Sequence, residues 1–275
     1  MTQASIGFIG GGNMARSLIG GLISDRYPAA LITVSEPDAG TRDTLARDFG
    51  IEVVDDNAQL VANNDVVVLA VKPQVMKEVA EAIADSVQAR RPLLVSIAAG
   101  IRAPDLERWL GGGCAIVRTM PNTPALVGSG ATGMYANAQV SAGQRGLAES
   151  LMRAVGLTLW VDDEDQMDAV TALSGSGPAY FFLILEVLQA AGQKLGLAQD
   201  SARLLAVQTA YGAAKMALES PEDAATLRRR VTSPGGTTEQ AIKVLEEGGI
   251  HDLFEQALAA ANRRSVELAD MFGEK

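Results

Sequence analysis

The chain has 275 residues, 48% of them hydrophobic, and a formal net charge of −10. This length fits one large domain or two ordinary ones, and the acidic balance argues against a broad nucleic-acid-binding surface. The only cysteine, Cys114, excludes an intrachain disulfide and a thiolate metal cluster, and the only histidine, His251, argues against a histidine-rich metal site. We therefore expect no metal and no nucleic-acid partner.

The beginning of the chain gives no sign of export. It passes directly into SIGFIGGGNMA without a basic segment and an apolar signal core, so we expect a cytoplasmic protein. The most apolar segment, 178–192, contains Glu186 and is too short to cross a bilayer, so we expect no membrane partner.

Short apolar runs alternate with amphipathic segments in the first part of the chain. They predict strands over 5–9, 31–35, 65–71, 93–98 and 114–120, and additional edge strands over 130–136 and 157–161. Their β-branched, nearly unalternating composition is typical of strands buried on both faces of a parallel sheet. The helical segments between them predict βαβ units, and hence an α/β fold with a Rossmann-type doubly wound sheet.

The pattern changes after residues 161–170, and only helices are expected from there on. Leu204, Val207 and Tyr211 recur at three- and four-residue steps, which is typical of one apolar helix face. We expect a Rossmann domain over 1–162 and an all-α domain over 163–275. The apolar helices 178–192 and 202–218 exceed what one small helical domain can bury, which indicates an oligomer.

A glycine-rich motif follows the first predicted strand. Gly10, Gly12 and Ala15 have the G-x-G-x-x-A spacing between a strand and a helix. These residues allow a tight turn, the close approach of a pyrophosphate, and close helix packing. The phosphates would meet the backbone at the helix start. The predicted contacts are Gly10, Gly11, Gly12, Asn13, Met14 and Ala15.

The end of the second strand is expected to bind the adenosine ribose. Glu36, directly after Ser35, would accept hydrogen bonds from the ribose hydroxyls and repel a 2′-phosphate, which favours NAD. Arg42 is close enough in sequence to compensate if the loop folds back. The choice between NADPH and NADH is therefore open at this stage.

Two further segments end predicted strands, where open α/β sheets bind their ligands. They are AVKPQ at 70–74 and SIAAG at 96–100. Lys72 precedes a proline, and we interpret it as a positioned surface charge with backbone contacts to a cofactor rather than as a catalytic lysine.

Two helix starts are expected in the helical part. In LSGSGPAYFF, Pro178 suits a first helical turn after a cap at Ser176 or Gly177. In SPGGTTEQ, a capping box joins Thr237 to Gln240, or Thr238 caps one residue later. Glycines before a cap leave backbone N–H groups uncovered, so the second start predicts an anion site, with a carboxylate as the expected ligand. Good capping without a ligand is the alternative.

The lone His251 leaves no Ser-His-Asp arrangement, and an alcohol dehydrogenase would need a base for its hydroxyl. A substrate that already contains an electrophilic C=N bond needs positioning, hydride and a hydrogen-bond donor. Thr238 could be that donor.

Taken together, FIGGGNMA, AVKPQ, MPNTPA at 120–125, LSGSGPAYFF and VTSPGGTT resemble the pyrroline-5-carboxylate reductase family over nearly the whole chain. The resemblance implies a Rossmann-type domain followed by a helical dimerisation domain that forms homodimers, often assembled into pentamers of dimers. It also implies NAD(P)H-dependent reduction of (S)-1-pyrroline-5-carboxylate, a small molecule, to L-proline, the final step of proline biosynthesis.

The resemblance also assigns site residues. It implies catalysis by Thr238, which would hydrogen-bond the ring nitrogen. Substrate contacts would involve Ser176, Gly177, Pro178, Gly235, Gly236, Thr237 and Thr238. Besides the glycine motif, the cofactor would contact Ser35, Glu36, Asn57 after the third strand, Ala70, Val71, Lys72, Pro73 and Ala98. Glu36 departs from the family, which usually favours NADPH and often has a small hydroxyl or basic residue there.

Two other functions remain open. A β-hydroxyacid dehydrogenase shares this layout but uses a lysine on the first helix of the second domain, where this chain has only Lys194 at the far end. A nucleotide-sensing regulator could retain the dinucleotide site without the chemistry, although the intact SPGGTT argues against it.

Overall fold

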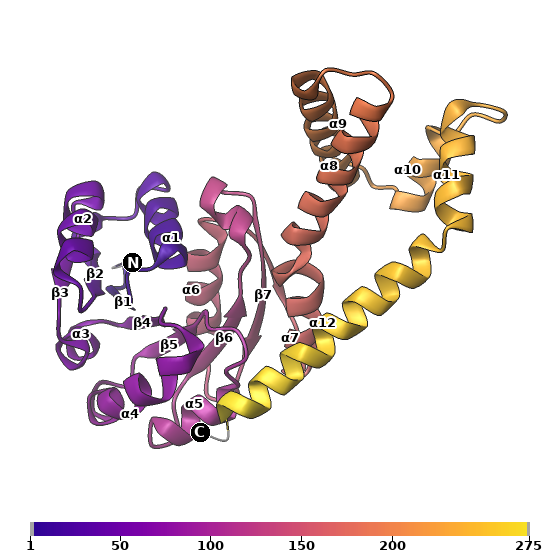
Figure 1. Cartoon of the computed structure of the whole chain (residues 1–275). Coiled ribbons are helices and arrows are strands. Elements are labelled where there is room, and N and C mark those ends of the chain that lie inside the picture. Colours follow the sequence, from indigo (N-terminus) through magenta and orange to yellow (C-terminus); the bar gives the residue numbers. More distant parts are fainter. Residues whose placement is uncertain (1–2, 274–275) are drawn as a thin grey trace. The chain divides into compact units, whose positions relative to one another are not determined.

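The computed structural model describes residues 3–273. An eight-stranded sheet with helices on both faces forms its first part, and helices alone follow in the described residues (Figure 1). The strands are β1 (Ile6–Ile9), β2 (Ile32–Ser35), β3 (Glu52–Val54), β4 (Val66–Leu69), β5 (Leu93–Ser96), β6 (Ile116–Met120), β7 (Gly130–Ala136) and β8 (Gly156–Trp160).

The strand order is β3-β2-β1-β4-β5-β6-β7-β8. All neighbouring pairs are parallel except β6 and β7, so the sheet is mixed rather than wholly parallel. The predicted edge strand at 130–136 is β7, which lies inside the sheet, whereas β8 is at the edge. The chain passes from β1 to β2 on one side and later to β4 on the other. This reversal of strand order is where open α/β sheets bind nucleotides.

The helices and short helical turns between the strands are α1 (Asn13–Ser24), η1 (Ala29–Leu31), α2 (Ala39–Phe49), α3 (Asn57–Asn63), α4 (Pro73–Arg90), α5 (Ala103–Trp109), η2 (Thr123–Val127) and α6 (Ala142–Arg153). Asp38 and Asp56 cap α2 and α3, because their carboxylates accept hydrogen bonds from backbone N–H groups of the first turn. Each cap lies between a strand and the next helix, so it fixes the residue at which the connecting loop ends and the helix begins.

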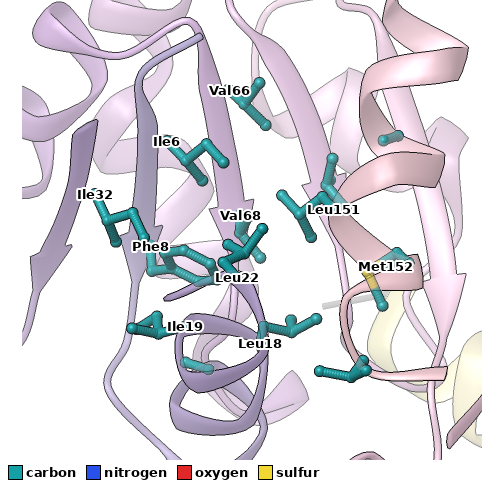
Figure 2. Packing of buried hydrophobic residues seen from close by; sticks show 14 of the residues in the cluster. Ile6, Phe8, Leu18, Ile19, Leu22, Ile32, Val66, Val68, Leu151 and Met152 are labelled. Carbon is teal, nitrogen blue, oxygen red and sulfur yellow. The ribbon is translucent and has the colours of Figure 1, made fainter. Parts of the chain in front are cut away.

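Two apolar cores lie on the two faces of the sheet. One packs α1, α2 and α6 against β1, β2 and β4, and Figure 2 shows Phe8 among Leu18, Ile19 and Leu22 of α1. The other packs α3, α4 and α5 against the opposite face. The central strands β1, β4 and β5 are buried along their whole length, as the sequence predicted for strands covered on both faces, whereas the outer strands β3 and β8 are partly exposed.

The later helices are α7 (Gln166–Val170), the π-helical turn η3 (Thr171–Gly175), α8 (Gly177–Lys194), α9 (Gln199–Glu219), α10 (Ala224–Arg230), α11 (Thr237–Glu247) and α12 (Ile250–Gly273). Contacts divide the described chain into a sheet unit, residues 3–176 and 260–273, and a helical unit, residues 177–259. The expected division into 1–162 and 163–275 stays a prediction about independent domains.

The end of α12 belongs to the sheet unit. Ser265 Oγ donates to Asp168 Oδ1 at 2.5 Å, and both residues are buried. Arg102 pairs with Asp270 at 2.7 Å, and Arg108 donates to the Gly273 carbonyl at 2.7 Å. Three polar contacts and the fully buried Ala269 therefore fix this segment against α5 and α7.

One apolar helix passes the length test for a membrane span, contrary to the sequence expectation. It runs over Gln166–Lys194, 29 residues with a mean hydropathy of 1.3, and 11% of its apolar window is buried. The expected segment, 178–192, was too short because it omitted α7 and the π-turn, through which the helix is continuous. Length and composition alone are weak evidence for a membrane span.

Candidate functional site: two glycine-rich helix starts

The glycine motif occupies the loop between β1 and α1. Gly10 has a φ of +100°, and a Cβ atom there would lie 2.9 Å from the Ala70 carbonyl oxygen. The Gly10 N–H donates to the Ser35 carbonyl at 2.8 Å. The loop thus joins the carboxyl ends of β1, β2 and β4, and only glycine fits at this point.

The start of α1 is open. Gly12 is the N-cap without a side-chain capping bond, it is exposed, and a Cβ atom there would meet nothing within 4 Å. Backbone N–H groups of a first helical turn have no partner within their helix, and the helix dipole favours an anion beside them. Ala15 behind this turn is buried against the sheet. The geometry fits the pyrophosphate of a dinucleotide.

Glu36 is fixed by backbone hydrogen bonds on both carboxylate oxygens. Its Oε2 accepts from the Gly11 N–H at 2.9 Å, and its Oε1 accepts from the Asp38 N–H at 3.2 Å. This bond between the end of β2 and the glycine loop keeps a carboxylate beside the phosphate site. It leaves lone pairs for ribose hydroxyl groups, whereas it repels an additional phosphate.

Arg42 does not face away from the loop. Its Nη1 donates to the carbonyl oxygens of Glu36 and Pro37 at 2.7 and 2.8 Å. The loop does fold back onto this arginine, and these two carbonyls occupy its Nη1. Nearby, hydrogen bonds from the Thr41 hydroxyl and the Thr41 N–H hold the pKa of the Asp38 carboxyl below its ordinary value. A second negative charge therefore accompanies Glu36.

The other predicted cofactor residues follow strand ends of the same sheet. Asn57 is the first residue of α3, Lys72 is the exposed N-cap of α4 with Pro73 behind it, and Ala98 is buried after β5. Ala70 donates its N–H to the Ile9 carbonyl at 2.9 Å, which aligns Ala70 and Val71 with the glycine loop. The structure brings the Gly10–Ala15 loop, Ser35, Glu36 and Ala70–Val71 together by direct contacts.

The structure corrects the first predicted helix start. Neither Ser176 nor Gly177 is an N-cap at a new helix, because α7, the π-turn and α8 form one helix. The Ser176 N–H donates to the Thr171 carbonyl at 2.8 Å, five residues back. Pro178 therefore lies inside a continuous helix, immediately after the π-turn. Its ring is accommodated because the turn has already shifted the hydrogen-bond pattern.

The second start is a helix start, but its cap differs from the prediction. The N-cap of α11 is Gly236, without a side-chain capping bond, and Thr237 is the first helical residue. Neither the Thr237–Gln240 box nor a Thr238 cap forms. Gly235 forms the turn before the helix with a φ of +74°. The helix therefore begins at Thr237, one residue earlier than a cap at Thr237 would allow.

Glu239 is a residue that the sequence analysis missed. Its Oε2 accepts from the Gly235 N–H at 2.8 Å, so one of the four amides expected to bind a carboxylate has a partner within the chain. The Gly236 N–H likewise donates to the Ser233 carbonyl at 3.0 Å. The spacing of an acidic residue three positions after Gly236, typical of capping boxes, could have indicated this. The N–H groups of Thr237 and Thr238 are the ones at the open first turn.

The predicted site residues thus fall into two groups in different units. The cofactor residues and Ser176 belong to the sheet unit, whereas Gly177, Pro178 and Gly235–Thr238 belong to the helical unit. Among residues 3–273, no group of three or more histidine, cysteine, aspartate or glutamate side chains is placed to hold a metal ion.

Comparison with known proteins agrees with both halves. Residues 164–268 match the family model "pyrroline-5-carboxylate reductase dimerisation", and residues 5–100 match "NADP oxidoreductase coenzyme F420-dependent". The pyrroline-5-carboxylate reductase of Pseudomonas aeruginosa is 56% identical over 274 residues, covering 100% of both chains. The Arabidopsis thaliana enzyme is 38% identical over 266 residues, covering 96% of this chain and 95% of its own.

This chain belongs to the pyrroline-5-carboxylate reductase family. Among solved structures, the Coxiella burnetii member has a TM-score of 0.95 at 50% identity, covering 98% of this chain and 99% of its own. The Plasmodium falciparum member, solved with NADP bound, has a TM-score of 0.85 at 29% identity, with coverages of 98% and 99%. The chain is accordingly a nicotinamide-dependent oxidoreductase of proline biosynthesis, with the Rossmann-type and helical parts that the sequence predicted.

Proposed function

We propose that this reductase converts (S)-1-pyrroline-5-carboxylate to L-proline with NAD(P)H. The observation that carries this proposal is the open start of α11, where the N–H groups of Thr237 and Thr238 follow two glycines in a chain with a complete dinucleotide loop. Two helix starts suit two anions, the pyrophosphate at α1 and the substrate carboxylate at α11.

Each residue then has a role that follows from its chemistry. The Thr237 and Thr238 amides hold the substrate carboxylate, and the Thr238 hydroxyl donates to the ring nitrogen. Gly235 and Gly236 keep side chains away from the carboxylate, and Ser176, Gly177 and Pro178 contact the ring. Bound NAD(P)H supplies the hydride. The protein's own task is to orient an imine that is already electrophilic, for which none of the proposed site residues needs to be a histidine.

The direct test follows the oxidation of NADH and NADPH optically, with and without pyrroline-5-carboxylate, in a sample shown to be folded. Substrate-dependent oxidation with proline as the product supports the proposal. Binding of the cofactor without turnover would instead support the nucleotide-sensing regulator. Oxidation of the cofactor only when a carbonyl acid replaces the imine, with reduction of that acid to a hydroxyacid, would support the dehydrogenase.

For the cofactor, we propose that this chain accepts NADPH, as is usual in its family, but prefers NADH. Glu36 is held in place by two backbone amides, Arg42 donates to carbonyls, and the lowered pKa of Asp38 keeps a second negative charge nearby. A 2′-phosphate would meet two carboxylates in this arrangement, and Arg42 already donates its Nη1 to two carbonyls. Hydroxyl groups of an unmodified ribose would instead find an acceptor.

Glu36→Ser tests the preference. Removing one of two nearby negative charges should raise the ratio of kcat/KM for NADPH over NADH by roughly tenfold. Asp85→Asn, at an exposed position of α4, removes one charge without a contact to the loop and serves as the control. An unchanged ratio in Glu36→Ser would contradict the role of Glu36, whatever the wild-type preference.

We also propose a homodimer formed through the C-terminal helices, with a pentamer of dimers as the larger assembly. Phe181, Phe182 and Leu183 of α8 are 65%, 65% and 60% exposed in the single chain, an apolar surface that water disfavours. The family's dimerisation model covers this helix. The same surface explains its membrane-like hydropathy, so we propose a soluble cytoplasmic protein whose α8 is covered by a second copy. A monomeric mass at micromolar concentration would contradict this.

A further inference from the structure

The motif MPNTPA has no role in the proposed mechanism so far, yet its asparagine makes two hydrogen bonds in a buried position. Asn122, which is 9% exposed, follows β6. Its Oδ1 accepts from the Ala131 N–H in β7 at 2.9 Å, and its Nδ2 donates to the Ser174 carbonyl in the π-turn at 3.0 Å. One side chain thus connects the sheet to the turn that precedes α8.

The bond to Ser174 lies where the helix changes its hydrogen-bond pattern. The Ser176 N–H donates to the Thr171 carbonyl, five residues back, and Pro178, two residues further on, has no N–H to donate. Asn122 adds a donor from outside the helix at the Ser174 carbonyl, although 52 residues of sequence separate the two.

The contact has a second, apolar component beside it. A Cβ atom on Gly175 would lie 2.6 Å from Cε of Met120, so the π-turn packs closely on the end of β6. The turn itself is held internally by Ser174 Oγ, which donates to the Val170 carbonyl at 2.9 Å. The π-turn is thus fixed from within and from the sheet. Such turns often lie at functional sites, because they change the direction in which the following residues face.

We propose that Asn122 is a positioning residue, which holds the π-turn Thr171–Gly175 and thereby sets the orientation of Ser176, Gly177 and Pro178 toward the substrate. This inference rests on the substrate role proposed above for those three residues. It assigns Asn122 no contact with the substrate or the cofactor.

Asn137 provides a matched control at the other end of the same strand pair. Its Oδ1 accepts from the Ile116 N–H at 3.0 Å and its Nδ2 donates to the Cys114 carbonyl at 2.9 Å. Asn137 and Asn122 thus both bridge two backbone groups with one amide, but one partner of Asn122 is in the π-turn, whereas both partners of Asn137 lie at or just before the start of β6. Replacing either asparagine by aspartate keeps the acceptor and turns the donor into an oxygen facing a carbonyl.

The experiment compares Asn122→Asp with Asn137→Asp in the full-length enzyme. Both should lose similar thermal stability. Only Asn122→Asp should lower kcat/KM for pyrroline-5-carboxylate, by roughly 10- to 100-fold, because small misplacements of binding groups have effects of this size. The affinity for the nicotinamide cofactor, measured by fluorescence, should be equal in the two variants. Equal kinetics in both would overturn the inference.

A readout without turnover separates this inference from the proposed function. Amide hydrogen exchange of the segment 171–178 should accelerate in Asn122→Asp and not in Asn137→Asp. Unchanged exchange in Asn122→Asp would overturn the inference even if the wild-type enzyme reduces the imine.

Discussion

The two glycine-rich helix starts resemble each other in sequence and differ in their surroundings. At the start of α1, Gly10 is buried against the Ala70 carbonyl, and Glu36 holds the Gly11 N–H. At the start of α11, Gly235 and Thr237 are exposed, and a Cβ atom on Gly235 would meet nothing within 4 Å. The first start is fixed by contacts with three strands. The second is held only by its own neighbours, Ser233 and Glu239.

This difference indicates how each start achieves its binding geometry. The α1 start is complete within one chain, so its affinity for a dinucleotide should depend on the shape of that chain alone. The α11 start is exposed within the helical unit, so the substrate site proposed there requires enclosing groups from outside this start. The dimer proposed above would bring a second copy as one source of such groups.

The largest effect is expected from replacing the positive-φ glycine of either helix start, Gly10 or Gly235, by alanine. Gly10→Ala should weaken nicotinamide cofactor binding by roughly 100-fold, because it adds a clash with the Ala70 carbonyl to the strain of a left-handed residue. Gly235→Ala adds only the strain, so it should raise the KM for pyrroline-5-carboxylate by less than roughly tenfold. Binding and initial-rate measurements check both. Equal effects would show that the α11 start is as tightly enclosed as the α1 start.

A smaller effect is expected from Thr238→Ala, which tests the chemistry of the α11 start rather than its shape. Loss of one hydrogen bond to the reacting imine should lower kcat by roughly 10- to 30-fold. The free energy of unfolding should change little, since no capping bond from Thr238 supports α11. Thr237→Ala, one residue earlier, is the control and should retain turnover. Near-normal kcat in Thr238→Ala would refute its assigned role.

The smallest effect concerns two equivalent caps, one in each unit. Asp38 and Asp223 accept hydrogen bonds from Thr41 and Thr226, which lower the pKa of both carboxyls. A lowered folded-state pKa stabilises above the ordinary pKa near 4, and this contribution disappears as the pH falls through the folded-state value. Asp38→Ala and Asp223→Ala should therefore lower the melting temperature slightly at pH 7, and this difference should disappear once the pH lies below the folded-state pKa of the carboxyl.

Thermal unfolding of these two variants also shows whether the units unfold separately. If the sheet and helical units are independent, Asp38→Ala moves one transition and Asp223→Ala moves another. If α12 couples them, both variants move a single transition. A destabilisation that persisted at low pH would contradict the role of the two carboxylates.

Local patterns predicted most of the fold and the α1 site. β-branched runs predicted seven of the strands because burial on both faces leaves a continuous apolar signature. The third strand, Glu52–Val54, has only three residues and is not fully buried, so its pattern is weak. Gly10 and Glu36 were recognisable because their spacing relative to a strand and a helix determines their contacts.

The structure of the helical half was harder to predict from local sequence patterns. A proline after glycines normally marks a helix start, but Pro178 lies in a helix that continues through a π-turn, and Asn122, which follows β6, donates to the Ser174 carbonyl of that turn. No pattern within LSGSGP contains that information. The cap of α11 was misplaced by one residue, because the turn depends on the left-handed Gly235 and on the Glu239 carboxylate rather than on the threonine hydroxyls.

The division of α12 between the units has a consequence for biosynthesis. Residues 265–273 complete the sheet unit through Asp168, Arg102 and Arg108, but the ribosome makes them after the whole helical unit, 177–259. A nascent chain exposes its N-terminal segments first. The dinucleotide-binding sheet can therefore form before synthesis is complete. The faces of α5 and α7 that contact Ser265 and Ala269 stay uncovered until the end of α12 has been made.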